Sequence, residues 1–244
     1  MIFPGGRLRG RPASAPPSHA QVLWRSVPGG NVEAWLLPAA HAGPAPLVLF
    51  SHGNGELIDD WPAMLTRYRE LGMHVLLPEY RSYGRSGGEP SERAVAEDAA
   101  WFVDAAAKVV EVDSSRVVLH GRSLGGGIVG RVLTDWRDQG RAPRGLILQS
   151  TFTSIPDVAR KWRVPAHLIE NRFPTVERLP AFDGPTLVLH GTEDALIPVA
   201  HGHALYRAAR HGELHTWPGT HNTLPMHPTA YWPAVESFLR RAGV

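Results

Sequence analysis

The 244-residue chain contains no cysteine. This absence excludes disulfide bonds, a thiolate nucleophile and any metal site built on cysteine. Histidine is plentiful, at 13 residues, and His201 and His203 lie close together in the sequence. Side chains two positions apart on a helix point to different faces, so this pair is not the start of a metal site. We therefore expect neither a metal nor another cofactor.

Long apolar runs are also missing, since no segment approaches the roughly 18 residues that a membrane-spanning helix needs. Residues 1–21 lack the apolar core of a secretory signal and are rich in Gly, Pro and Ala, with almost no aromatic residue on which a base can stack. The formal net charge is only +2. We expect a cytoplasmic protein with a flexible arm at residues 1–21, no nucleic-acid partner and no stable membrane insertion.

Apolar runs and turn signals alternate along residues 22–244, as expected for a single α/β domain of this length. The predicted strands are residues 22–27, 31–37, 46–51, 73–77, 116–120, 145–149, 186–190 and 213–217. The predicted helices are residues 62–71, 92–109 and 124–137, a helix after residue 198 and a final helix. Strands that alternate with helices pair in parallel, so we expect a mostly parallel, doubly wound sheet with helices on both faces. The first two strands form a hairpin at its edge in this prediction.

One segment breaks the alternation. Residues 151–184 are longer than the usual connection between elements and contain aromatic residues and prolines. We predict a small cap here, in which Phe152, Ile155, Trp162 and Phe173 are candidates to line an acyl pocket. The alternative is that these side chains only pack the cap onto the sheet.

One short pattern carries chemistry. Residues 121–125 read GRSLG, which fits G-x-S-x-G, and they follow directly on a predicted strand. This pattern is typical of a nucleophilic serine on a sharp turn between a strand and a helix, where flanking glycines allow a strained backbone and close packing. Ser123 is therefore the predicted nucleophile. The amide of Leu124, at the start of the helix, is predicted to donate to the oxyanion that forms during acyl transfer.

Two further signals follow in chain order. Asp194 lies just past the predicted strand 186–190, and His221 lies in a turn after the predicted strand 213–217. The order serine, aspartate, histidine, with each residue after a strand, is the one expected of an α/β-hydrolase. His221 would take the proton of Ser123, and Asp194 would hold the imidazole in the required tautomer. Glu193 is the alternative carboxylate, but an exposed charge is the simpler expectation for it.

A second oxyanion donor is expected after the predicted strand 46–51. Glycines flank Asn54 in this loop, and they allow its backbone to turn an amide toward the nucleophile. Asn54 is the predicted donor, although an ordinary turn between a strand and a helix explains the same residues equally well. Arg122 also has two interpretations, contact with an anionic leaving group or pairing with a nearby carboxylate, and we favour the structural pairing.

Several motifs longer than the serine pattern support a family resemblance. They are residues 51–55 (SHGNG), 80–92 (YRSYGRSGGEPSE), 121–126 (GRSLGG), 149–155 (QSTFTSI), 191–194 (GTED) and 219–222 (GTHN). In these motifs, over about residues 30–240, the chain resembles the Bem46-like group of α/β-hydrolase domain-containing proteins. The resemblance implies a serine hydrolase of esters or thioesters, and some members of this group remove fatty acyl groups from proteins.

From the sequence we expect hydrolysis of a small-molecule ester or acyl substrate through an acyl-enzyme on Ser123. No oligomeric state follows from the sequence. One alternative is an aminopeptidase-like peptidase of the same fold, which usually needs a larger cap and an acidic cluster for the free amine of its substrate. Another is a non-catalytic binding protein that has the hydrolase fold.

Overall fold

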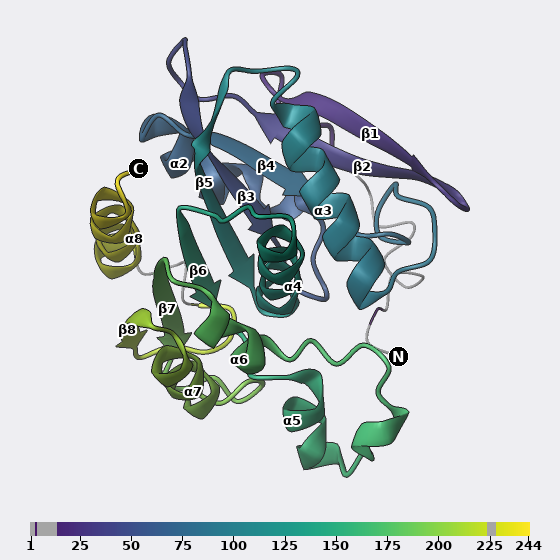
Figure 1. Ribbon diagram of the computed structural model, residues 1–244, viewed down its shortest axis with the longest axis vertical. Helices are drawn as coiled ribbons and strands as arrows, with labels where there is room; N and C mark the ends of the chain where they lie inside the picture. Colours follow the sequence, from purple (N-terminus) through teal and green to yellow (C-terminus); the bar gives the residue numbers. More distant parts are fainter. Residues whose placement is uncertain (1–2, 4–13, 224–227) are drawn as a thin grey trace. The chain divides into compact units, whose positions relative to one another are not determined.

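The computed structural model describes residues 3, 14–223 and 228–244 (Figure 1). These residues divide into two compact units, Met1–Val117 and Val118–Val244. Most of the predicted arm, at residues 1–2 and 4–13, lies outside the described residues, and the single domain over residues 22–244 stays a prediction. Within the described residues, no helix combines the length and the apolar character needed to cross a membrane.

The first unit holds four strands in the order β1-β2-β4-β3. Its elements are β1 (Gln21–Val27), β2 (Gly30–Leu37), β3 (Ala45–Ser51), η1 (Ile58–Asp60), α2 (Pro62–Glu70), β4 (His74–Pro78) and α3 (Glu92–Ala106). Strands β1 and β2 form the predicted antiparallel hairpin, β2 pairs antiparallel with β4, and β3 pairs parallel with β4. Residues of β1 alternate in burial, whereas β3 and β4 are buried throughout and mostly apolar, as expected for an edge strand and for central strands.

Helix α3 begins as its sequence predicts and ends early. Ser91 caps it by accepting a hydrogen bond from the amide of Ala94 at 3.1 Å. The helix ends at Ala106, three residues before the predicted end at residue 109. The amides of Lys108 and Val109 bond to carbonyls three residues earlier, so the chain tightens into a turn there instead of continuing the α-helix.

The second unit contains four parallel strands in the order β5-β6-β7-β8. Strand β5 (Val112–Arg122) starts in the first unit. The other elements are α4 (Leu124–Asp138), β6 (Gly145–Gln149), α5 (Ile155–Ala159), η2 (Arg160–Trp162), η3 (Ala166–Leu168), α6 (Thr175–Arg178), η4 (Leu179–Ala181), β7 (Pro185–Gly191), α7 (Ala200–Ala208), β8 (His211–Trp217) and α8 (Pro228–Ala242). Parallel pairing through crossover helices, predicted from the alternation of elements, is confirmed in this unit.

The register of these strands aligns their carboxyl ends at one edge. Arg122 pairs with Gln149, and Gly191 pairs with Trp217. The loops that follow these strands therefore all begin at the same edge of the sheet. In α/β proteins the functional side chains lie on the loops at this edge. The segment 151–184, green in Figure 1, leaves from here as a series of short helices, from α5 to η4, where the sequence predicts a cap.

A buried polar cluster lies between strands β5 and β6 and helix α8. His120 and Gln149 are both fully buried, and His120 Nε2 lies 3.1 Å from Oε1 of Gln149. The hydroxyl of Tyr231 donates to the same oxygen at 2.9 Å. Burial lowers the pKa of His120 to about 3, against the opposing effect of the bond to Gln149. The imidazole is therefore neutral in the folded protein at any pH near neutrality.

This neutral histidine makes stability depend on pH. In the unfolded chain His120 has its ordinary pKa of 6.5 and is protonated below that pH. In the folded protein it becomes protonated only near pH 3. The stability that neutral His120 provides is complete above pH 6.5 and is lost as the pH falls. We expect the free energy of unfolding to decrease by roughly 1.4 kcal/mol per pH unit between pH 6 and pH 4.5 from this residue.

Urea unfolding at several pH values measures this slope in the wild type and in His120→Gln, which has no group to titrate. The variant should show the shallower slope. His203→Gln is the matched control, since His203 is exposed, and it should follow the wild type. Equal slopes in the wild type and His120→Gln would contradict the assignment.

Candidate active site

Ser123 occupies a sharp turn between a strand and a helix. Strand β5 ends at Arg122 and helix α4 begins at Leu124, so Ser123 alone makes the turn. Its backbone has φ 52° and ψ −117°, a conformation that residues with a side chain rarely adopt. The amide of Ser123 donates to the carbonyl of Gln149 at 2.9 Å, which ties the turn to the end of strand β6. Ser123 therefore has the strained backbone that its sequence pattern predicts.

Glycines allow this turn to close tightly. A Cβ atom on Gly121 would lie 2.3 Å from the carbonyl oxygen of Gly125, and one on Gly126 would lie 2.2 Å from Oγ1 of Thr151. Both distances are far inside van der Waals contact. Thr151 also donates from Oγ1 to the carbonyl of Ser123 at 2.6 Å. Close packing of the turn against the loop after β6 thus holds Ser123 in its conformation.

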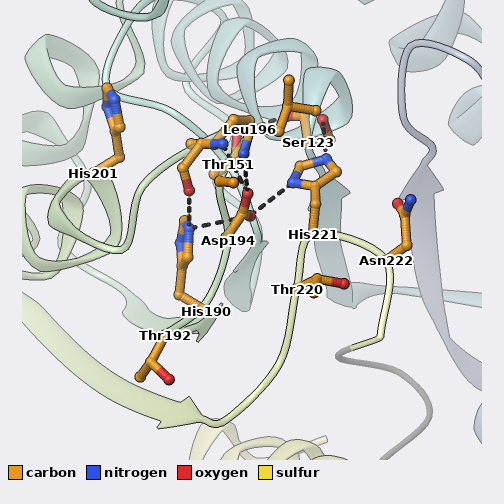
Figure 2. A network of polar contacts seen from close by, with 12 residues as sticks. Ser123, Thr151, His190, Thr192, Asp194, Leu196, His201, Thr220, His221 and Asn222 are labelled. Atoms are coloured by element: carbon orange, nitrogen blue, oxygen red, sulfur yellow. Dashed lines mark hydrogen bonds and ion pairs between the residues drawn. The ribbon is translucent and has the colours of Figure 1, made fainter.

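Three side chains from separate loops of the second unit form a hydrogen-bonded chain (Figure 2). His221 Nε2 lies 3.0 Å from Oγ of Ser123, and His221 Nδ1 lies 2.7 Å from Oδ2 of Asp194. An ionised carboxylate only accepts hydrogen bonds, so Nδ1 carries the proton of a neutral His221. Nε2 is then the acceptor for the hydroxyl of Ser123. This arrangement can move the serine proton onto the imidazole.

Asp194 is the carboxylate that reaches His221. Its side chain is buried, and its Oδ1 accepts hydrogen bonds from the amides of Leu196 at 2.9 Å and Ile197 at 2.8 Å. Burial acts to raise the pKa of Asp194, but hydrogen bonds from histidine side chains and from the amide of Ile197 outweigh it and hold the pKa well below its ordinary value. Glu193, the alternative considered from the sequence, has an exposed side chain.

His190 is a further member of this network that the sequence interpretation treated only as the end of a strand. Its side chain is fully buried, and Nε2 donates to the carbonyl of Ile197 at 2.8 Å. The same Nε2 lies 3.6 Å from Oδ2 of Asp194 (Figure 2). His190 therefore supports the Asp194 loop from beneath. The available signal was a histidine at the end of a buried strand, directly before the acid loop.

Arg122 holds the loop that carries His221. Its buried guanidinium donates from Nη2 to the carbonyl of His221 at 3.2 Å and to Oδ1 of Asn222 at 2.8 Å. Burial lowers the pKa of Arg122 to about 10, while the nearby Tyr231 and Asp194 act to raise it. Arg122 is therefore charged at neutral pH, and these contacts give it a structural role on the histidine loop.

The two predicted oxyanion donors lie in different units. Leu124 is the first residue of helix α4, so its amide is among those that have no partner within the helix. Asn54 follows strand β3, and its Oδ1 accepts a hydrogen bond from the hydroxyl of Tyr83 at 2.6 Å. The amide of the preceding Gly53 donates to Glu56 at 2.6 Å, so this loop is ordered within the first unit. The oxyanion roles of Leu124 and Asn54 stay predictions.

The candidate pocket residues of the cap differ in their surroundings. Phe173 is fully buried, and a Cβ on Gly127 would lie 2.8 Å from it, so its ring packs against helix α4. Phe152 is also buried, and Ile155, at the start of α5, is half-buried. The side chain of Trp162 lies outside the described part of the chain. Packing of residues 151–184 against helix α4 thus accounts for Phe173, and the cap and the pocket role of the four residues stay predictions.

The chain is similar to known hydrolases in sequence and in fold. Residues 42–176, more than half of the chain, match the family described as Serine aminopeptidase, S33. The chain is 29% identical over 212 residues to the uncharacterized protein Rv2307c of Mycobacterium tuberculosis, and the matched region covers 86% of this chain and 74% of that protein. It is 30% identical over 205 residues to the alpha/beta hydrolase domain-containing protein WAV2 of Arabidopsis thaliana, and the matched region covers 77% of this chain and 66% of that protein.

Among solved structures, the chain is similar to a thermophilic esterase from Thermogutta terrifontis with malate bound. The TM-score is 0.69 at 21% sequence identity, over 92% of this chain and 100% of the esterase chain. At this identity the likeness shows a shared fold. The predicted α/β-hydrolase fold is confirmed.

The tight packing at Gly126 predicts a large effect of a single methyl group. Gly126→Ala is expected to lower the free energy of unfolding by roughly 1–3 kcal/mol, because the new Cβ overlaps Thr151. Gly130→Ala, one turn along the same helix, is the matched control, since its Cβ would meet Cγ2 of Thr175 at a milder 3.3 Å. The helix propensity of alanine offsets that contact, so the control should change by less than about 1 kcal/mol. Urea unfolding of both variants measures the difference, and equal stabilities would contradict this account of the turn.

Proposed function

Because the chain belongs to the serine aminopeptidase S33 family of α/β hydrolases, we propose that it is a serine hydrolase that cleaves carboxylic esters or thioesters. The observation that carries the proposal is the hydrogen-bonded chain from Ser123 through His221 to Asp194. These side chains come from three separate loops. A hydroxyl bonded to an imidazole that is bonded in turn to a carboxylate is what proton transfer from the serine requires, whereas a purely structural contact does not require this combination. The cytoplasmic location expected from the sequence belongs to the same proposal.

In the proposed reaction, Oγ of Ser123 attacks the acyl carbon of the substrate while His221 takes the serine proton. Asp194 stabilises the imidazolium that forms. The negative charge on the acyl oxygen is met by amides, for which we assign Leu124 and Asn54. His221 then gives its proton to the leaving alcohol or thiol, and the acyl group stays on Ser123. Water, activated by the same imidazole, releases the acid and restores the serine.

A peptidase of the same fold is the second candidate, favoured by the description of the matched family as an aminopeptidase. An aminopeptidase needs carboxylates to hold the ammonium group of its substrate. In the cap, Asp157 already accepts hydrogen bonds from the hydroxyls of Thr153 and Ser154 and from Arg160. The carboxylate of Asp157 is thus committed to its own segment, which favours ester cleavage as the first candidate.

The nucleophile is tested by labelling with a fluorophosphonate, which reacts with activated serines. The wild type should form one adduct, detected by intact mass, and folded Ser123→Ala should form none and lose turnover by several powers of ten, because members of such a site act as a unit. Turnover of p-nitrophenyl esters, acyl thioesters and aminoacyl p-nitroanilides then separates esterase, thioesterase and aminopeptidase activity. Equal labelling of both folded proteins would place the reactive group elsewhere, and labelling of neither would favour a binding protein with a hydrolase fold.

The choice of carboxylate is tested with a matched pair of neighbouring variants. Asp194→Asn removes the charge that stabilises the imidazolium and can reverse the tautomer of His221, so we expect kcat to fall by roughly 10³- to 10⁴-fold. Glu193→Gln makes the same chemical change on an exposed side chain, and kcat should stay within about twofold of the wild type. Steady-state kinetics on the best ester substrate measures both. A larger loss in Glu193→Gln than in Asp194→Asn would overturn the assignment.

A further inference from the structure

A cavity lies in the second unit, away from Ser123. It has a volume of about 530 Å³ and is lined by the loops that enter strands β6 and β7 and by the ends of helices α4 and α8. These loops meet the amino ends of the parallel strands, whereas Ser123, Asp194 and His221 follow the carboxyl ends. A cavity of this size suits a small organic molecule. The proposed hydrolysis makes no use of it.

The charged side chains of this cavity are nearly all of one sign. The lining includes a single acidic residue, Asp183, and five arginines, which are Arg137, Arg141, Arg144, Arg178 and Arg241. Asp183 is itself within 3.4 Å of Nη1 of Arg210 and within 3.6 Å of Nε2 of His211, so its charge is partly met from outside the cavity. Positive side chains therefore outnumber negative ones among the residues that line the cavity.

Two of the arginines make contacts with groups that carry no charge, a backbone carbonyl and an aromatic ring. Arg144 donates from Nε to the carbonyl of Ala242 at 2.6 Å. Among the described residues this bond involves Nε alone, so both Nη groups can donate to a ligand. The guanidinium of Arg141 lies 4.5 Å from the centre of the buried Trp136 ring. Contacts of this kind hold a guanidinium in one orientation before a ligand binds. Less side-chain entropy is then lost when the guanidinium forms a bidentate bond.

Helix ends explain part of the charge. Arg137 and Arg241 lie in the last turns of α4 and α8, where a cation offsets the helix dipole, and each also has a carboxylate partner, Asp138 and Glu213 respectively. Arg141 lies after the end of α4, in the loop to β6, so the helix-end explanation does not reach it. The walls between the arginines are apolar and include the buried side chains of Leu133 and Phe182.

We propose that this cavity is a binding site for a small organic phosphate, with guanidinium groups around the phosphate and the apolar wall against the organic part. Arginine is suited to phosphate because its planar donors pair with two oxygens at once, and several arginines from different segments can surround a dianion. The site is independent of the proposed hydrolysis. Phosphate chemistry is shared by free phosphate and by phosphate esters, so the test includes a probe for each.

The test is isothermal titration calorimetry of the full chain with phenyl phosphate and with inorganic phosphate at one fixed ionic strength. The wild type should bind one phenyl phosphate saturably, and inorganic phosphate more weakly, because only the ester contacts the apolar wall. The double variant Arg141→Gln/Arg144→Gln should bind phenyl phosphate at least tenfold more weakly. Arg131→Gln is the matched control, since Arg131 lies on helix α4, pairs with Asp135 and does not line the cavity.

Arg137→Gln gives a second variant that the fold tolerates, because Arg137 is exposed and pairs with the adjacent Asp138; it should also weaken binding. Circular dichroism verifies that each variant is folded. Absence of saturable binding to the wild type, or equal binding by the arginine variants and Arg131→Gln, overturns the site. Equal affinity for the two probes overturns the part of the proposal that assigns the organic group to the apolar wall.

Discussion

The buried carboxylate of Asp194 is the group on which the organisation of the second unit depends. An ionised carboxylate inside a protein is stable only when donors replace the water that it loses. Here the amides of Leu196 and Ile197 meet one oxygen and His221 meets the other. The donors come from two loops, so both loops must be ordered before the charge can be buried. His190, beneath the same loop, bonds to Ile197 and brings a third element into the arrangement.

The end of strand β5 and the turn that follows it bring two consecutive side chains to the histidine loop. Ser123 meets the ring of His221, and Arg122 bonds to the backbone of His221 and to Asn222. The ring is thus held by its own loop, whose position Arg122 sets, and not by the carboxylate alone. Because burial still leaves the pKa of Arg122 at about 10, the guanidinium stays charged at neutral pH. Its contacts with His221 and Asn222 therefore persist at neutral pH as well.

The loop that carries Asn54 is ordered by a polar network inside the first unit. Glu79 is buried, and its Oε1 lies 2.8 Å from Nε2 of His52, while its Oε2 accepts from the amide of Ile58. Tyr83 reaches Asn54 directly. This network leaves the backbone of Asn54 in a defined conformation, which is the property that an oxyanion donor requires, since a donor that must first reorganise stabilises charge less well.

The sequence by itself determined the strands and the longer helices, the parallel pairing and the strained turn at Ser123, because apolar periodicity and a glycine-bounded serine are local properties of the chain. It did not determine the short helices of residues 151–184. It also placed Asp194 and His221 after strands, since their order follows the order of the fold. The tertiary structure decided which carboxylate reaches the imidazole, because Asp194 and Glu193 are neighbours in sequence and only the path of the loop separates a buried side chain from an exposed one. It alone revealed Arg122 on the histidine loop and the arginine-lined cavity, because each joins residues distant in the chain. It also showed His190 beneath the acid, because the contact of His190 with Ile197 depends on the path of the loop that follows the strand.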